Sequence, residues 1–584
     1  MYNKKGGATT GENRDLATDA QRSPGRTAIF WLLLAGIAAA AGTMEVRSVL
    51  DETQTWDEGI HISAGYSYLT LGDYSWNTEH PPLVKLLCAL PLTWMGLKAE
   101  RYTPDGRLKD QIQYGKDFLY ENRKHADTIL FAARAPNIAL TLMFLVGLGW
   151  WVRRRWGAIA GLIAAALCAF DPNLIAHGRY VTTDYPLTVF FFFACVLWAE
   201  YLDIGGRRRL LIASVAIAVA MVVKFSALLL IPPLALLYAL CWIRRPAEFG
   251  VKRTLVAGTA VIACTAVMVA VVYWPETMRC LTGKMKPLAE VVPPGNFIGN
   301  SLVWAGRRFH LPAHAFLTGL GRVSEHNAGG HPTYLMGLRS NTGFWYYFPV
   351  VFAVKSTMAA LAATLIVTAA GTWIVWKRRA SAVTPIAMGL VLPPLLYFIF
   401  SMSSAINLGM RHILPIYPFL YVGLAALLAG AAGGRLRGLG IACAAMLAML
   451  QIAECASIHP DYLAFFNAPA GGPGRGAEYL VDSNIDWGQD LKKLARWLNV
   501  HGKKQANLYY FGNAIPAYYG IKDLGMPGAM NQQEWDNLDD YMVANVTSLN
   551  GVYAPLIGLA PVRLRDPVAK IGWSMYVYDF RKKK

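Results

Sequence analysis

The stretch TILFAARAPNIALTLMFLVGLGWWVRRRWGAIAGLIAAALCAFDPNL, residues 128–174, determines the fold class of this chain. Two apolar runs, near 128–152 and 157–174, flank three consecutive arginines at 153–155. A bilayer core about 30 Å thick is crossed by roughly 20 mostly apolar helical residues. Each run therefore predicts a transmembrane helix, and the arginines mark a short connection on one side of the membrane.

The same pattern recurs along the whole chain. Of its 584 residues, 55% are apolar and only 16% are charged, which is the balance of a membrane protein and not of several soluble domains. We predict an α-helical multi-pass membrane protein with about eleven transmembrane helices, near residues 28–44, 128–152, 157–174, 185–204, 210–224, 226–243, 254–274, 350–376, 384–402, 413–431 and 438–456.

Positive charge is concentrated in alternate connections. The formal net charge is +18, and basic residues cluster at 153–155, 207–209, 244–253, 377–379 and 435–437. The short loops between them carry chiefly Arg179 and Arg411. Because positive residues stay on the cytoplasmic side during insertion, the N-terminus is predicted inside and the C-terminus outside. The basic excess is thus a topology signal, and nucleic acid is not expected as a partner.

Long segments are predicted on the outer side. Residues 1–27 are polar and Gly-rich and indicate a disordered cytoplasmic tail, followed by a membrane domain over 28–456. The outer segments 45–127, 275–349 and 457–584 are too long for simple connections, and ordered long loops are usually functional. The last has helix-like (486–498) and strand-like (507–512, 541–548) patterns, so we expect a small extracytoplasmic α/β C-terminal domain.

Candidate chemistry begins just after the first span, at Thr55-Trp-Asp-Glu-Gly59. Thr55 and Glu58 have the spacing of a capping box, which gives Glu58 a structural explanation. Asp57 lies on another face of the same first turn. A helix N-terminus stabilises the anionic form of a carboxylate, which suits a group that must accept a proton. Simple complementarity with the helix dipole is the alternative for Asp57.

A second candidate is the segment Glu79-His80-Pro-Pro-Leu-Val-Lys85, which opens another helix. Lys85 in a first turn opposes the helix dipole. That conflict disappears if an anion such as phosphate lies between the two. The alternative is that Lys85 extends to the lipid headgroups.

Further ionisable and aromatic residues are predicted at the outer edge of the membrane: Arg179, Asp184, Lys224, Lys355, Arg411, His412 and the aromatic run 345–347, which includes Tyr346. Arg179 and Asp184 could simply form an ion pair, and the aromatics could simply be an interfacial belt. Together the cations and carboxylates indicate a site for an anionic, lipid-borne substrate. For Asp486 we favour a role as the cap of the following helix, with Gln489 at the third position, over the alternative that it binds the acceptor.

These motifs resemble the GT-C class of integral-membrane glycosyltransferases. The likeness is greatest to the dolichyl-phosphate-mannose protein mannosyltransferase family and its bacterial relatives, including the lipid A aminoarabinose transferases, and runs from about residue 28 to about 550. It rests on Asp57-Glu58, on His80-Pro-Pro-Leu83 with Lys85, on 179–184, on 343–349 with Lys355, on 411–418 and on 483–491.

The resemblance implies an inverting transferase that uses a polyprenyl-phosphate-linked sugar, with an acceptor glycan, lipid or protein on the extracytoplasmic side of a bacterial cytoplasmic membrane. Asp57 would be the general base and Glu58 a supporting carboxylate. Lys85, Arg411, Lys355 and His80 would bind the donor phosphate, and Arg179, Asp184, Tyr346 and His412 would bind substrate. No metal or other cofactor is implied, because lysine and arginine would neutralise the phosphate. The chain lacks the large lumenal β-trefoil insertion of the eukaryotic protein mannosyltransferases.

Two other classes of function remain as alternatives. A transporter or flippase of a lipid-linked sugar would share the phosphate-binding cations but would need no base. It would also call for charge near the bilayer midplane and paired broken helices, and the predicted spans are largely free of both. A membrane anchor that presents the C-terminal domain would explain neither of the two long loops.

Overall fold

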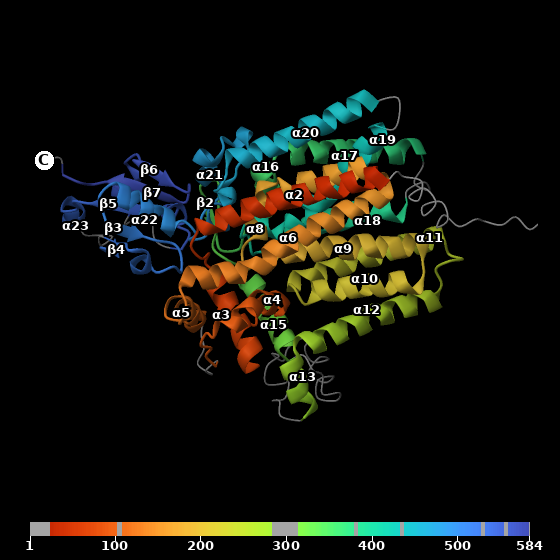
Figure 1. The fold of residues 1–584 in the computed structure, drawn as a ribbon, viewed down its shortest axis with the longest axis horizontal. Coiled ribbons are helices and arrows are strands. Elements are labelled where there is room, and N and C mark those ends of the chain that lie inside the picture. Colours follow the sequence, from red (N-terminus) through yellow and green to blue (C-terminus); the bar gives the residue numbers. More distant parts are fainter. Residues whose placement is uncertain are drawn as a thin grey trace, which may run out of the picture.

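A computed structural model of the chain describes residues 24–101, 108–282, 314–378, 384–432, 437–526, 532–553 and 559–582. It consists of a long bundle of helices with a smaller, sheet-containing region at one end (Figure 1). Most of the predicted N-terminal tail and residues 283–313 of the predicted loop 275–349 lie outside the described residues.

Each of the eleven predicted spans coincides with helix in the structure. The helices of the bundle are α2 (Pro24–Leu50), α6 (Ala126–Trp156), α7 (Ala158–Ala169), α8 (Pro172–Gly178), α9 (Asp184–Ile204), α10 (Arg207–Met221), η2 (Phe225–Leu230) with α11 (Ile231–Arg244), α12 (Val251–Val272), α16 (Tyr347–Lys355), α17 (Met358–Arg378), α18 (Pro385–Ser401), α19 (Tyr417–Ala432) and α20 (Arg437–Ser457).

The lengths of these helices decide how many could cross a bilayer alone. Within the described residues seven are long and apolar enough, and two bent pairs raise the number to nine. The pair α7–α8 is bent by 68° and the pair α16–α17 by 116°. With 15 and 17 residues, α10 and α18 are shorter than a straight crossing requires. The chain is a mostly helical multi-pass membrane protein, and the count of eleven spans stays a prediction.

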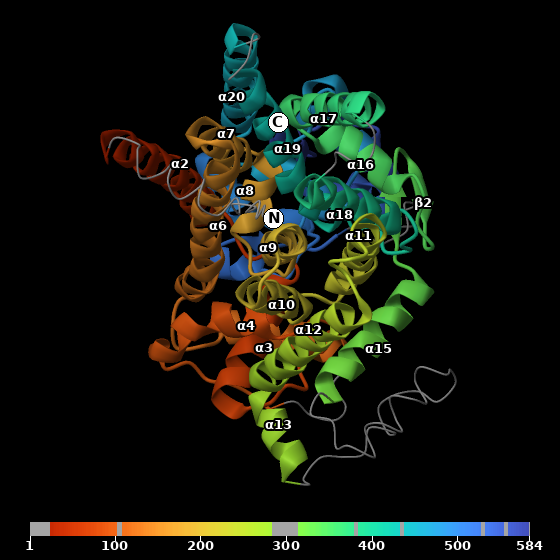
Figure 2. The ribbon, with the colours of Figure 1, turned by 90° about the vertical axis from the view of Figure 1, so that its right-hand side faces the viewer.

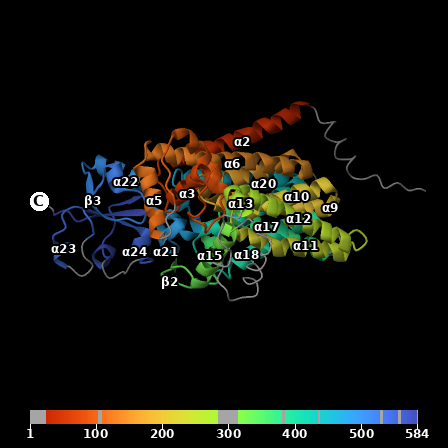
Figure 3. The same ribbon diagram turned by 90° about the horizontal axis from the view of Figure 1, so that it is seen from below.

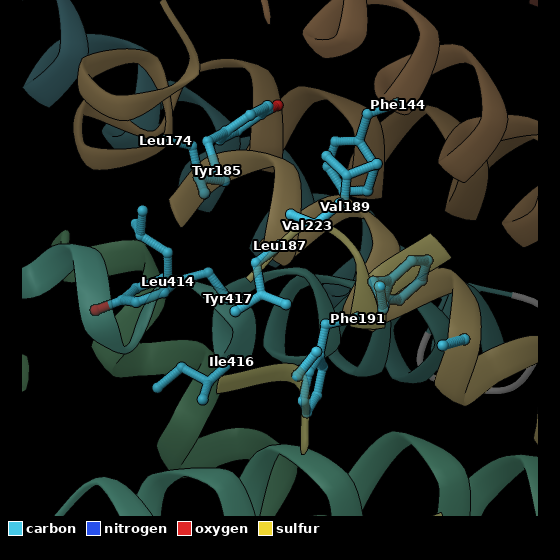
Figure 4. Close-up of a cluster of buried hydrophobic side chains, with 14 of the residues drawn as sticks. Phe144, Leu174, Tyr185, Leu187, Val189, Phe191, Val223, Leu414, Ile416 and Tyr417 are labelled. Carbon is cyan, nitrogen blue, oxygen red and sulfur yellow. The ribbon is translucent and has the colours of Figure 1, made fainter. Parts of the chain in front are cut away.

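Helix α9 lies at the centre of the bundle. Its sequence is apolar on every face, which is the pattern of a helix surrounded by other helices. It packs against α10, α18 and the segment before α19 (Figure 2). Figure 4 shows Leu187 and Phe191 of α9 gathered with Leu414, Ile416 and Tyr417 in this core.

A set of shorter elements forms a layer at one end of the bundle, the end at which α2 finishes and α3 begins. They are α3 (Glu58–Leu71), α4 (Leu83–Ala89), η1 (Leu90–Met95), α5 (Leu108–Tyr120), α13 (Trp274–Leu281), α15 (His314–Gly329) and the hairpin β1 (Thr333–Leu335) and β2 (Leu338–Ser340). Helix α3 crosses α4 at Gly65, where a Cβ would lie 2.2 Å from the carbonyl oxygen of Lys85. Only glycine permits this close crossing.

The C-terminal region contains a five-stranded sheet in the order β4-β3-β5-β7-β6. β3 is parallel to β4 and β5, whereas β7 is antiparallel to β5 and β6, so that Leu508 faces Val543 and Val543 faces Val577. Figures 1 and 3 place the sheet beyond α5 at one end of the bundle. Its elements are α21 (Pro473–Tyr479), α22 (Leu491–Val500), β3 (Gln505–Tyr509), β4 (Lys522–Asp523), α23 (Gln532–Asp536), β5 (Tyr541–Asn545), α24 (Val546–Leu549), α25 (Ala560–Arg563), β6 (Ala569–Ile571) and β7 (Met575–Asp579).

Candidate active site

Asp57 lies at the start of α3, where the chain passes from α2 into the layer of shorter elements. It precedes the helix as its N-cap residue, but its side chain makes no capping hydrogen bond. Instead its Oδ2 accepts a hydrogen bond from Nη1 of Arg411, at 3.1 Å. The Asp57 side chain remains 28% exposed, so a substrate can reach it.

Arg411 joins Asp57 to a second acidic residue. It lies in the short turn η5 (Met410–His412), and its Nη1 is also 3.8 Å from Oδ2 of Asp184, the first residue of α9. The other oxygen of Asp184 accepts a hydrogen bond from Nζ of Lys224, at 2.5 Å. Asp57, Arg411, Asp184 and Lys224, which we call the charge cluster, thus alternate in sign and come from four separate elements.

Electrostatics keep Arg411 charged in this position. Burial would lower the pKa of Arg411, but the Asp184 and Asp57 carboxylates raise it above its usual value. The guanidinium lies over the Trp487 ring, 4.4 Å from its centroid, and its buried Nε has no hydrogen-bond partner within the described part of the chain. Arg411 therefore keeps unused donor capacity beside Asp57.

Three histidines surround the charge cluster in their neutral form. His61 is buried and His80 lies edge-on to it, with ring centroids 5.4 Å apart. Burial, followed by the cations Lys224 and Arg411, holds the pKa of His412 well below its usual value. Burial, followed by His61 and Lys224, does the same for the pKa of His80. The formal charge of the cluster is therefore set by its two carboxylates and two cations.

Glu58 is fully buried and engaged on both of its oxygens. Arg134 donates to Oε1 and Oε2 at 2.8 and 2.6 Å, and the amides of Thr55 and Val181 donate at 2.8 and 3.0 Å. Burial would raise the pKa of Glu58, but Arg134 and these hydrogen bonds bring it below its ordinary value. The predicted bond to the Thr55 amide is present, although the helix begins at Glu58 itself. Glu58 thus anchors the loop that carries Asp57.

Lys85 is enclosed by oxygens of the protein. Its Nζ donates to the Tyr68 hydroxyl at 3.0 Å, to the carbonyl and side-chain oxygens of Asn77 at 2.6 and 3.1 Å, and to the His80 carbonyl at 2.8 Å. The side chain is fully buried. In this structure Lys85 fixes the turn before α4 to α3, so its predicted contact with phosphate stays a prediction.

Three further predicted site residues make contacts away from the charge cluster. Nζ of Lys355 donates to the carbonyls of Leu463 and Asn484. Tyr346 lies beside the Phe344 ring, with centroids 5.7 Å apart. Arg179 donates to Glu52 at 2.7 Å, so the alternative of a simple Arg179–Asp184 ion pair does not hold, and the roles of both residues in binding substrate stay predictions. Asp184 is the first residue of α9, which brings it to Lys224 and Arg411 instead.

The predicted capping role of Asp486 is also wrong. Helix α22 begins at Leu491, five residues later, because the chain first makes a turn at Gly488, where φ is +85°. Asp486 instead accepts hydrogen bonds from the Asn545 side chain at 2.6 Å and from the Thr547 amide at 3.1 Å. The motif at 483–491 therefore connects the bundle to the sheet.

Several residues of the site were not among the predicted site residues. Lys224 was noted only as an ionisable residue at the membrane edge, and its position at the break between two apolar runs was the available signal. Arg134 lies inside the predicted span 128–152, where a charge by itself indicates a buried partner. No sequence signal pointed to Glu52. Within the described ranges no group of three or more His, Cys, Asp or Glu side chains could hold a metal ion, and the metal-free reaction stays a prediction.

Comparisons with known proteins bear on this arrangement. A family profile described as dolichyl-phosphate-mannose-protein mannosyltransferase matches residues 127–274, which include Asp184 and Lys224. The oligosaccharyltransferase AglB from Archaeoglobus fulgidus, solved with an inhibitory peptide and a dolichol-phosphate, aligns over 91% of this chain and 72% of its own, with 11% identity and a TM-score of 0.50. The chain resembles the GT-C membrane glycosyltransferases.

The structure of ArnT from Cupriavidus metallidurans bound to undecaprenyl phosphate aligns over 95% of this chain and 98% of its own, with 15% identity and a TM-score of 0.42. No curated protein sequence matches the chain. The GT-C resemblance expected from the sequence motifs is confirmed.

Proposed function

We propose that this protein is an inverting glycosyltransferase that moves a sugar from a polyprenyl-phosphate donor to an acceptor hydroxyl on the extracytoplasmic side of a bacterial cytoplasmic membrane. The charge cluster carries the proposal, because it joins the partly exposed Asp57 carboxylate to Arg411 and, through Asp184, to a second cation, Lys224. The dolichol-phosphate in the AglB structure supports a polyprenyl-phosphate donor.

Asp57 is the general base of the proposed reaction. It takes the proton of the acceptor hydroxyl while that oxygen bonds to the anomeric carbon from the face opposite the phosphate. The bond from the anomeric carbon to the phosphate oxygen breaks, and polyprenyl phosphate leaves with the electron pair. Asp57 directly precedes the 14-residue helix α3, and the hydrogen bond from Arg411 orients its carboxylate.

Arg411 and Lys224 bind the donor phosphate in this proposal. Negative charge grows on the leaving phosphate in the transition state, and fixed cations that meet this charge lower the barrier. Lys224 is 13% exposed, and Arg411 has an Nε without a partner in the described residues. Lys85 and Lys355 are fully buried among oxygens of the protein, whereas the Arg411 and Lys224 side chains keep 10% and 13% exposure, so we assign the phosphate to these two cations.

The distribution of charge supports the proposed orientation. Helix α6 runs from Asp127, which pairs with Lys492 of the C-terminal region at 2.9 Å, to Arg153–Arg155 at its far end. A helix of 31 residues is about 46 Å long. The arginines therefore lie at the end of the bundle opposite the charge cluster, and the positive-inside rule places them in the cytoplasm.

Incubation of the purified protein with a panel of polyprenyl-phosphate sugars tests this proposal, with mass spectrometry for released polyprenyl phosphate. Wild type should release it from one donor, and Asp57→Asn should lower release by at least about 100-fold. The matched control is Asp51→Asn, because Asp51 precedes Asp57 in the same loop and pairs only with exposed Arg496 among the described residues. Equal release by wild type and Asp57→Asn would remove Asp57 from the proposed role.

A transporter or flippase of a lipid-linked sugar remains the second candidate. The observation in its favour is the presence of two bent helix pairs, α7–α8 and α16–α17, because broken helices are frequent in transporters. These breaks were not predicted from the sequence. The same experiment separates the two functions. A flippase would bind the intact donor and release no polyprenyl phosphate, even with membrane extract supplied as a source of acceptor.

A further inference from the structure

The loop of residues 51–57, which we call the Asp57 loop, is bonded through its backbone to a turn far away in the sequence. The Trp56 amide donates to the Trp487 carbonyl at 2.9 Å, and the Thr53 amide donates to the Gln489 carbonyl at 2.8 Å. The Thr53 hydroxyl donates to the Gly488 carbonyl at 3.0 Å. The turn 487–489 thus accepts three hydrogen bonds from the Asp57 loop.

Residues that follow strand β3 hold the other side of the same loop. The Asn513 side chain donates to the Trp56 carbonyl at 2.9 Å, and the Gln54 side chain donates to the Asn513 carbonyl at 2.8 Å. The Trp56 ring stacks on the Phe511 ring, with centroids 4.9 Å apart and an angle of 17°. Trp56, the residue directly before Asp57, is therefore fixed at its amide, its carbonyl and its side chain.

The two contact segments also support each other. A Cβ on Gly488 would lie 2.7 Å from the Cα of Gly512, so the turn and the end of β3 touch through their backbones. The Tyr510 hydroxyl donates to the Gly488 carbonyl at 2.6 Å. Trp487 of the same turn lies under the Arg411 guanidinium. The turn 487–489 of the C-terminal region thus contacts both the Asp57 loop and Arg411, the cation that pairs with Asp57.

We propose that the C-terminal region completes the catalytic centre, with the turn 487–489 and residues 511–513 setting the position of the Asp57 carboxylate. Asn513 and Phe511 are positioning residues in this assignment, because they act through the backbone and ring of Trp56. The inference rests on the proposed role of Asp57 as the base. A base works only within hydrogen-bond reach of the acceptor hydroxyl, and a displacement of about 1 Å can lower the rate about 100-fold.

Hydrogen–deuterium exchange tests the positioning without any assay of activity. Asn513→Ala and Phe511→Ala should raise the exchange rate of peptides covering 51–57 by at least about tenfold. Each removes a contact that holds Trp56, so the Thr53 and Trp56 amides separate more often from their acceptors, the Gln489 and Trp487 carbonyls. Asn550→Ala is the matched control. Its side chain also donates to a backbone carbonyl of the C-terminal region, that of Val546 at 2.8 Å, but it does not touch the Asp57 loop.

Kinetics test the consequence for transfer. Asn513→Ala should lower kcat at least about tenfold while the donor KM stays within about twofold, because the cations that bind phosphate lie on other elements. Phe511→Ala should behave alike, and Phe511→Tyr, which keeps the stacked ring, should restore kcat to within about threefold of wild type. If Phe511→Ala does not fold, Asn513→Ala decides the result alone.

Unchanged exchange at 51–57 in Asn513→Ala would overturn the inference, as would an equal loss of kcat in Asn550→Ala. A wild-type protein that transfers no sugar from any donor would instead contradict the proposed function. The exchange experiment would still decide whether the C-terminal region holds the Asp57 loop.

Discussion

Asp57 and Glu58 are neighbours in the chain with opposite surroundings. Asp57 has one ion pair and a partly exposed side chain, whereas Glu58 is buried against Arg134 and two backbone amides. Two carboxylates side by side can therefore serve one reaction in two ways. One stays accessible for proton transfer, and the other fixes the loop on which the first is carried.

The pair of Arg134 and Glu58 leads to a prediction about stability. Both side chains are almost fully buried, and loss of one partner leaves a buried charge uncompensated. Arg134→Met should destabilise the protein by about 3–5 kcal/mol. The double variant Arg134→Met, Glu58→Gln should be less destabilised, because it removes both charges. Thermal unfolding in detergent measures both, and equal losses in the two variants would contradict the explanation.

The matched control for Arg134→Met is Arg475→Met. Arg475 also pairs with a glutamate, Glu478, at 2.7 Å, but both side chains are more than half exposed. Exposed pairs contribute about 0–1 kcal/mol, so this variant should unfold close to the wild-type temperature.

The histidines beside the charge cluster predict a dependence of stability on pH. Burial and nearby cations lower the pKa of His80 in the folded protein, whereas an unfolded chain has the ordinary value of about 6.5. Below about pH 6.5, His80 binds a proton in the unfolded state but stays neutral in the folded state. The free energy of unfolding therefore decreases as pH falls, and the contribution of His80 to stability is lost.

To measure this contribution, the unfolding temperature is determined at pH 7.5 and pH 5.5, and the drop between the two is compared in wild type and variants. The drop in unfolding temperature on acidification should be smaller in His80→Gln than in wild type. His501→Gln, at an exposed position, should show the wild-type drop. An equal drop in wild type and His80→Gln would mean that His80 does not carry the effect.

At the scale of elements, the crossing of α3 and α4 depends on a single glycine. Gly65→Ala would place a methyl group 2.2 Å from the Lys85 carbonyl oxygen and force the two helices apart. We expect a loss of about 1–3 kcal/mol in stability, measured by thermal unfolding. Gly258→Ala in α12 meets nothing within 4 Å and should stabilise by up to about 1 kcal/mol. Equal effects of the two substitutions would show that the crossing tolerates a Cβ.

Elements with a strong apolar pattern were predictable from the sequence, and the junctions between them were not. Runs such as 185–204 predicted α9 to within a residue at its start, because apolar length alone identifies a bilayer helix. The start of α22 was missed, since Asp486 and Gln489 fit a cap but bind the sheet and the turn instead. Local spacing could not reveal that Asn545, 59 residues later, competes for the Asp486 carboxylate.

Local spacing also could not reveal which residues pair within the candidate active site. That Asp57 and Arg411 lie at the same end of the bundle could be predicted, because motif order and loop polarity are local properties of the sequence. The identity of their partners could not, since Asp184 meets Lys224, and Arg179 meets Glu52, through helix packing. Lys85 illustrates the difference. Its charge predicted a ligand, but the fold surrounds its ammonium with four protein oxygens.

At the scale of the whole molecule, the proposed orientation can be tested by labelling. Arg208, in the first turn of α10, and Lys522 of strand β4 are both exposed. A membrane-impermeant maleimide should label Lys522→Cys in intact spheroplasts, and it should label Arg208→Cys only after permeabilisation. Most native cysteines in the described residues are buried, and wild type provides the background. The reverse labelling pattern would contradict the proposed orientation.

The backbone bonds between residues 53–56 and the turn 487–489 also have a consequence for biogenesis. The Asp57 loop leaves the ribosome early, but its acceptors for hydrogen bonding are made more than 400 residues later. A nascent chain can insert its first helices and still lack a rigid Asp57 loop. In the proposed mechanism, a working centre forms only when residues 487–513 have been synthesised and have reached the same side of the membrane, so incomplete chains would leave the cell's pool of lipid-linked sugar untouched.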